Sequence, residues 1–201
     1  MRGLYRFIIK PLENRYNNEK KIGDKSLITN TKIEDYKSVS KRAIIVSTPT
    51  AFKTILNPGD EVIVHHNVFR RFYDIRGKEK DSSSFFKDNM YFCHVDQIYL
   101  YKQGGEYKTN LEYCFVKPIA ETSLLSTDKE RPLIGIIKYD NPSLNRLGIE
   151  KEMLVTFKPD SEFEFIIGNE RLYCMKSSDI VIKHEYQGDE EEYNPSWAQS
   201  G

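Results

Sequence analysis

The chain has 201 residues, in which 30 Lys and Arg residues are balanced by 30 Asp and Glu residues. This length suits one large domain or two small ones. The balanced charge argues against a generally basic nucleic-acid binder, and no window approaches the ~20 apolar residues that span a membrane. The N-terminus lacks the apolar stretch of a signal peptide, so we expect a cytoplasmic protein.

Short segments rich in Val, Ile, Tyr and Phe recur between Gly, Pro, Asn and Asp residues, a pattern typical of β-strands. No stretch keeps an apolar period of 3.6 residues, so we expect few and short helices in an all-β fold. The predicted strands are residues 5–11, 42–47, 61–65, 89–94 and 97–101, followed by 112–117, 133–139, 153–157, 163–167, 170–175 and 180–184.

Turn residues separate these strands. Asn57-Pro58-Gly59-Asp60 supplies the fixed φ and then the positive φ of a type II turn. Gly168-Asn169 suits a two-residue hairpin. We interpret residues 103–106, QGGE, as the linker between two domains.

The strands of the first half return in the second half in the same order. The matched segments are FIIKP (7–11) with CFVKP (114–118), AIIV (43–46) with IGII (134–137), PGDEVIV (58–64) with IEKEMLV (149–155), MYFC (90–93) with LYCM (172–175), and QIYL (97–100) with DIVI (179–182). A unit of this size exceeds the ~20 to 50 residues of a solenoid repeat. We therefore predict two duplicated domains, residues 1–103 and 104–185, and an acidic tail, residues 186–201.

Two long interruptions distinguish the first copy. Residues 13–41 are polar and exceed the ~12 to 15 residues at which a structureless loop suggests a function. They contain an apolar pair inside Ser26-Leu27-Ile28-Thr29, and a shorter loop of the second copy contains Leu124 and Leu125. The second interruption, residues 66–88, has no full counterpart.

The first copy resembles the GroES-like small co-chaperonins in the order of its segments. These are a strand ending in Lys-Pro, a long loop with an apolar tip, a Pro-Gly-Asp turn and a closing Asp-Ile segment. The resemblance implies two tandem, partly open β-barrels per chain that assemble with further copies and dock on a chaperonin ring. It assigns docking to the loop tip, namely Ser26, Leu27, Ile28 and Thr29. The chain departs from the family in its reduced roof hairpin, residues 47–57, and in the insertion at 66–88.

These departures favour a second hypothesis, a structural or assembly protein, for example of a phage particle. Such a protein would act in a bacterial host or in the virion. The insertion offers a further partner surface, in which basic and aromatic side chains alternate as in single-strand binders. Because mixed charges follow, we favour a protein partner over nucleic acid. The residues of this surface are Phe69, Arg70, Arg71, Phe72 and Tyr73.

The acidic tail carries Tyr193 and the only Trp of the chain, Trp197. Tails of this composition tend to be disordered until bound, and aromatic anchors dominate binding energies. Trp197 either docks on its own barrel or enters a neighbouring copy, and we favour the neighbour.

No pattern of residues points to catalysis, a cofactor or a metal, so we expect no enzyme. His65 and His66 are adjacent on a predicted strand and should face opposite ways. Cys93, Cys114 and Cys174 lie in apolar strands, where free cysteines usually belong to the core.

Overall fold

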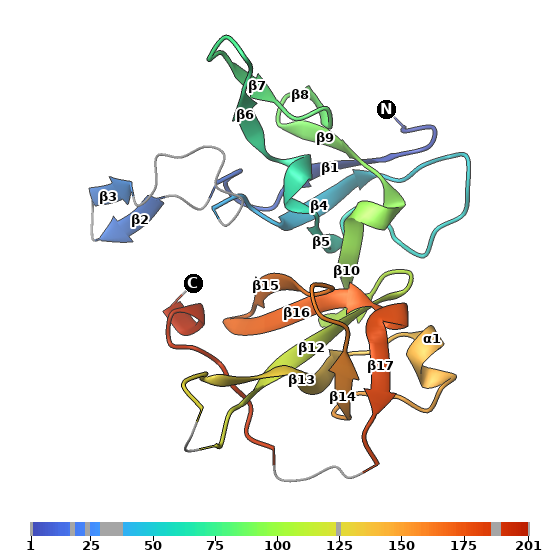
Figure 1. Cartoon of the computed structure of the whole chain (residues 1–201). Coiled ribbons are helices and arrows are strands. Elements are labelled where there is room, and N and C mark those ends of the chain that lie inside the picture. The colour runs from blue at the N-terminus through green and yellow to red at the C-terminus, as the bar shows by residue number, and fades with distance from the viewer. Residues whose placement is uncertain are drawn as a thin grey trace. The chain divides into compact units, whose positions relative to one another are not determined.

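The computed structural model describes residues 2–16, 19–22, 25–28, 38–123, 126–185 and 190–200, with only the backbone in 19–22, 25–28 and at 200. The described residues are predominantly β, with one short α-helix, α1 (Pro142–Asn145). The chain divides into two compact units, Met1–Tyr107 and Lys108–Gly201. Figure 1 shows both units with most of their strands labelled.

Unit 1 contains a seven-stranded sheet with the order β11-β10-β5-β4-β1-β9-β8. Its strands are β1 (Phe7–Pro11), β4 (Arg42–Ser47), β5 (Glu61–Val64), β8 (Phe85–Lys87), β9 (Met90–Cys93), β10 (Ile98–Gln103) and β11 (Glu106–Thr109). Two hairpins form separate two-stranded sheets: β2 (Glu19–Ile22) with β3 (Lys25–Ile28), and β6 (Arg71–Tyr73) with β7 (Glu79–Asp81). Residues 13–41, which we predicted to form a long loop, thus contain a hairpin.

Unit 2 contains a six-stranded sheet with the order β15-β16-β12-β13-β14-β17. Its strands are β12 (Tyr113–Ala120), β13 (Glu130–Tyr139), β14 (Leu154–Phe157), β15 (Phe163–Ile167), β16 (Glu170–Lys176) and β17 (Ile180–Lys183). The sheets are antiparallel, and over the described residues none closes on itself.

The two main sheets share one strand order. When β1 is matched with β12, the sequence β8-β9-β1-β4-β5-β10 corresponds strand by strand to β15-β16-β12-β13-β14-β17. Irregularities repeat as well, because the pairing shifts between Ile8 and Ile9 in β1 and between Phe115 and Val116 in β12. β10 and β17 are each preceded by a 3-10 turn of three residues. The duplication seen in the sequence is therefore also a duplication of topology.

Pairing corrects two of the sequence matches. Ala43 faces Pro11 and Val62, whereas Gly135 faces Pro118 and Val155, so Ala43 corresponds to Gly135 and not to Ile134. A shift of one residue moves a strand's side chains to the other face. Segment 58–64 is likewise misaligned by two residues, because Gly59 and Glu152 donate equivalent backbone hydrogen bonds, to Ile45 and Ile137.

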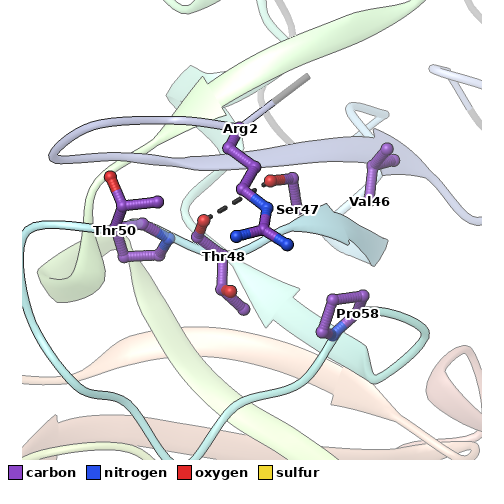
Figure 2. A pocket seen from close by; sticks show the side chains of 7 residues that line it. Arg2, Val46, Ser47, Thr48, Thr50 and Pro58 are labelled. Atoms are coloured by element: carbon purple, nitrogen blue, oxygen red, sulfur yellow. Dashed lines mark hydrogen bonds between the residues drawn. The ribbon is translucent and has the colours of Figure 1, made fainter.

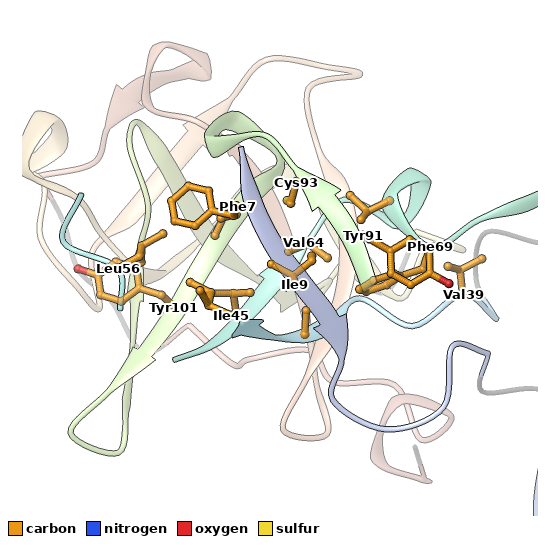
Figure 3. Packing of buried hydrophobic residues seen from close by; sticks show 14 of the residues in the cluster. Phe7, Ile9, Val39, Ile45, Leu56, Val64, Phe69, Tyr91, Cys93 and Tyr101 are labelled. Carbon is orange, nitrogen blue, oxygen red and sulfur yellow. The ribbon is translucent and has the colours of Figure 1, made fainter. Parts of the chain in front are cut away.

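Each unit has its own apolar core. In unit 1 Phe7, Ile9, Ile45 and Val64 pack together from β1, β4 and β5 (Figure 3). In unit 2 the corresponding positions of the sheet are Cys114, Val116, Ile137 and Phe157. All three cysteines are free and buried, as predicted, and burial raises the pKa of the Cys114 thiol to about 12.

Both predicted turns form. Asn57 accepts from the N–H of Asp60 at 3.1 Å, and Gly59 has φ 96°, as a type II turn requires. Gly168 and Asn169 join β15 to β16. Gly104 and Gly105, which we interpreted as a linker, instead connect the neighbouring strands β10 and β11, both with positive φ.

Candidate interaction surfaces

The segment predicted to dock leaves the unit 1 sheet through a closed base. Tyr16 and Val39 form an antiparallel bridge, and Ser40 N–H donates to the Arg15 carbonyl at 3.0 Å. Tyr16 and Val39 are only 7% and 2% exposed, within the core cluster. Both ends of residues 17–38 are therefore held by buried contacts.

Three of the four predicted docking residues lie on the hairpin beyond this base. Ser26, Leu27 and Ile28 belong to β3, where Leu27 pairs with Lys20 of β2. Their side chains, and Thr29 altogether, lie outside the described residues. The same is true of Leu124 and Leu125.

The equivalent excursion of unit 2 is short. Ala120 pairs with Glu130, and Glu121 N–H donates to the Lys129 carbonyl at 3.2 Å. The chain therefore returns to the sheet soon after leaving it. The long excursion between paired residues, which we predicted to dock, has no counterpart of similar length here.

The insertion of unit 1 is fixed to the same base. Arg15 donates to the carbonyls of Phe69 and Arg70 at 2.5 and 3.2 Å, and forms an ion pair with Asp81 at 2.5 Å. The Tyr16 hydroxyl accepts from the N–H of Arg71 at 2.7 Å. Two consecutive residues of the loop base thus hold the β6–β7 hairpin in place.

This hairpin presents apolar side chains to solvent. Phe72 and Tyr73 are 39% and 51% exposed, and Ile75 at the tip is fully exposed. Asp74 shapes the tip, because its carboxylate accepts from the N–H groups of Arg76 and Lys78, both at 2.9 Å.

The predicted surface around these residues needs one correction. Phe69 is fully buried, with its ring 4.8 Å from that of Tyr91, because it ends the 3-10 turn that packs on the core. Arg70 and Arg71 are partly buried, and Arg71 pairs with Glu79 at 2.6 Å. Phe72 and Tyr73 of the predicted surface are exposed, and the structure adds Ile75 at the tip, which the sequence pattern did not single out.

The two histidines lie on the same side of the chain, contrary to our prediction. β5 ends at Val64 and His66 begins a 3-10 turn, so strand alternation stops, and the two rings stack with centroids 4.3 Å apart. Burial, together with the nearby charges of His65, Lys41 and Arg70, lowers the pKa of His66 to about 4. Across the described residues, no group of three or more His, Cys, Asp and Glu side chains is arranged to hold a metal.

Unit 1 also has a shallow hollow beside the end of β4, shown in Figure 2. Arg2, Ser47, Thr48 and Thr50 line it, and the Ser47 hydroxyl donates to the Thr48 carbonyl at 3.4 Å. Arg2 is exposed to solvent. The lining thus combines hydroxyls and one exposed cation with the apolar residues Val46, Pro49 and Pro58.

The described part of the tail lies on unit 2. Pro195 is buried and Ala198 is 0% exposed, so this part of the tail packs against its own unit. Trp197 keeps 51% of its surface exposed, and the guanidinium of Arg171 lies 5.8 Å from its ring centroid. Tyr193 is half-buried and donates its N–H to Pro118. Their role as anchors for a neighbouring copy stays a prediction.

Comparison with other proteins adds no relative. Neither the models of known protein families nor the curated protein sequences give a match to this chain. None of the helices in the described residues is long and apolar enough to cross a membrane.

Proposed function

We propose that the protein is a non-enzymatic, co-chaperonin-like binding protein that assembles with itself and docks on a chaperonin ring through Leu27 and Ile28. The observation that carries the proposal is the closed base of residues 17–38, with its buried Tyr16–Val39 bridge. The repeated strand order supports it, because two tandem domains of one family would share a topology.

A closed base suits a docking segment for a physical reason. A segment that orders on binding loses conformational entropy, so each contact is weak. Fixing both ends close to the sheet limits the number of residues that must become ordered. Several copies in one assembly then raise the affinity through effective concentration.

A structural or assembly protein, for example of a phage particle, is the second candidate. It is favoured by the β6–β7 hairpin, which exposes Phe72, Tyr73 and Ile75 at a tip shaped by Asp74. Exposed apolar side chains on an ordered turn are typical of protein-binding surfaces. Under this proposal the hairpin tip joins copies of the chain or joins the chain to another particle protein.

One experiment separates the two candidates. The protein is sedimented with a bacterial chaperonin ring in the presence and absence of nucleotide. Nucleotide-dependent binding is expected, and Leu27→Ser with Ile28→Ser should weaken it at least about a hundredfold, because two apolar anchors of ~1.5 to 3 kcal/mol each are lost.

The matched control is Phe72→Ser with Ile75→Ser, which removes two exposed apolar side chains from the other hairpin. Binding to the ring should persist in this control. If the native protein binds no ring and the control variant loses self-assembly, the assembly function replaces the co-chaperonin function.

A further inference from the structure

The tail joins unit 2 as an added strand. Glu192 forms an antiparallel bridge with Ile119 of β12. Ala120 N–H donates to the Glu191 carbonyl at 2.7 Å, and Tyr193 N–H donates to the Pro118 carbonyl at 2.9 Å. These bonds lie beyond the last pair of β12 with β16, which is Val116 with Tyr173. The tail thus occupies a stretch of β12 that β16 leaves open.

Side chains fix the register of the added strand. The Asn194 side chain accepts from the N–H of Arg171 at 3.2 Å and donates to the Asn169 carbonyl at 2.9 Å. Pro195 and Ala198 are buried beyond it, and Trp197 lies against the Arg171 guanidinium. Backbone bonds with alternating side-chain anchors are how sheet edges recognise extended peptides.

The groove and the tail have complementary charges. The Lys117 ammonium is almost buried, 2.6 Å from the Glu192 carboxylate and 3.6 Å from that of Glu170. Arg131 lies 3.7 Å from Glu190. Charge-assisted contacts of this kind favour an acidic ligand over a neutral one.

The tail is an addition to the repeated frame. Lys10, the unit 1 counterpart of Lys117, is exposed, and the isolated bridges of the described residues include no counterpart of Ile119–Glu192 in unit 1. A sheet with this strand order therefore forms without an added strand at this position. The groove of unit 2 can exist before the tail fills it.

We infer that this groove, formed by Lys117, Pro118, Ala120, Asn169 and Arg171, is a binding site for extended acidic peptides, and that in assemblies its occupant is the tail of a second copy. Exchange of an identical terminal element between copies costs little, because the same contacts form again. Each tail then links its own unit 2 to that of a neighbour, independently of any chaperonin.

The first test uses a chain that ends at Glu185 and a fluorescently labelled peptide of residues 189–201. Saturable binding with one peptide per chain is expected. Glu192→Lys in the peptide should weaken it about tenfold or more, because the charged contact to Lys117 is lost. Glu191→Gln is the matched control, since the exposed Glu191 contributes its backbone carbonyl, and affinity should stay unchanged.

Absence of saturable binding to a folded shortened chain overturns the inference. Folding is checked by amide hydrogen exchange of β12 and β16. If the shortened chain does not fold, the test uses the full chain instead, with a protease site introduced between residues 185 and 190. The chain is cleaved there after it has folded. After cleavage, excess labelled peptide must exchange with the severed tail, and a tail that never exchanges also overturns the inference.

The second test identifies the occupant. A donor with Lys117→Glu repels its own tail, and the acceptor that ends at Glu185 contains no Trp, so Trp197 of the donor is the only indole. Adding acceptor should shift the donor's Trp emission to the blue, and an acceptor carrying Lys117→Glu should not. If the peptide binds but no shift occurs, the second copy is excluded as the occupant.

Discussion

Unit 1 and unit 2 share a strand order but differ in what is attached to it. Unit 1 carries the β2–β3 and β6–β7 hairpins, and Arg15 and Tyr16 hold the β6–β7 hairpin in place. Unit 2 returns quickly between β12 and β13 and carries the docked tail. The repeated frame therefore holds the core, whereas the segments outside the repeat form the candidate binding surfaces.

Equivalent tyrosines illustrate the division. Tyr91 of β9 is covered by the Phe69 ring at 4.8 Å and by the Arg15 guanidinium at 5.2 Å. Its counterpart Tyr173 in β16 donates its hydroxyl to Glu130 at 2.6 Å. Burial raises the pKa of both phenols. The same frame position therefore serves an edge-to-face ring contact and a cation–π contact in one unit and a hydrogen-bond network with Glu130 in the other.

The largest expected effect distinguishes the packing of the two frames. A Cβ at Gly135 would lie 2.3 Å from the Lys117 carbonyl oxygen and 2.5 Å from the Val116 side chain, whereas Ala43 already carries a Cβ at the equivalent position. Gly135→Ala should lower the free energy of unfolding of unit 2 by about 2 to 3 kcal/mol. Urea unfolding followed by hydrogen exchange in β13 measures it.

Ala43→Gly is the matched control in unit 1. It should lower the free energy of unfolding by only about 1 kcal/mol, because it removes one buried methyl group and gives the unfolded chain more conformational freedom. Equal costs for the two substitutions would contradict the difference in packing that the comparison rests on.

Much of the frame could be predicted from the sequence. β4 and β15 have the predicted bounds, because apolar residues and turn formers delimit them locally. The β6–β7 hairpin escaped prediction because its strands contain mainly charged residues, which lack apolar alternation. The register of Gly135 was missed by one residue because Ile flanks it on both sides, so the sequence does not distinguish the faces.

The candidate surfaces were predicted less well, since they depend on contacts between distant residues. The insertion was recognised as foreign, but the burial of Phe69 depends on Tyr91, and the exposure of Ile75 depends on the turn that Asp74 shapes. Composition suggested a disordered tail. The docked tail contacts Lys117, far away in the sequence, and no local pattern reveals this contact.

The second prediction tests whether pH acts on one unit only. The His66 pKa, near 4 when folded and about 6.5 when unfolded, means that the unfolded chain binds more protons between these values. The free energy of unfolding of unit 1 should therefore fall from pH 6.5 to pH 4 and level off below. Because His66 is only half-buried and solvent screens it, we expect a loss of about 1 to 2 kcal/mol.

Unit 2 provides the internal control for this effect. The N–H groups of His65 and Lys158 donate equivalent hydrogen bonds, to the carbonyls of Gln97 and Asp179, so these two residues correspond. The unit 2 counterpart of His66 is therefore Pro159, which does not titrate. His66→Gln should reduce the acid sensitivity of unit 1 in urea unfolding between pH 4 and 7. A pH response in unit 1 that is unchanged by His66→Gln would rule out the histidine as its source.

The smallest expected effect concerns the turn before β5 and β14. Gly59 and Glu152 occupy equivalent positions with φ 96° and 68°, which glycine adopts freely and a side chain disfavours by ~1 to 2 kcal/mol. Glu152→Gly should therefore stabilise unit 2 by about 0.5 to 1 kcal/mol, because the relieved strain exceeds the added entropy of the unfolded chain.

Gly59→Ala should destabilise unit 1 by about 1 kcal/mol, although no atom lies within 4 Å of the added Cβ. Thermal unfolding of the two variants checks the signs. Opposite signs mean that the two turns share one backbone and differ only in how well their residues fit it, whereas destabilisation in both would show that Glu152 contributes contacts of its own.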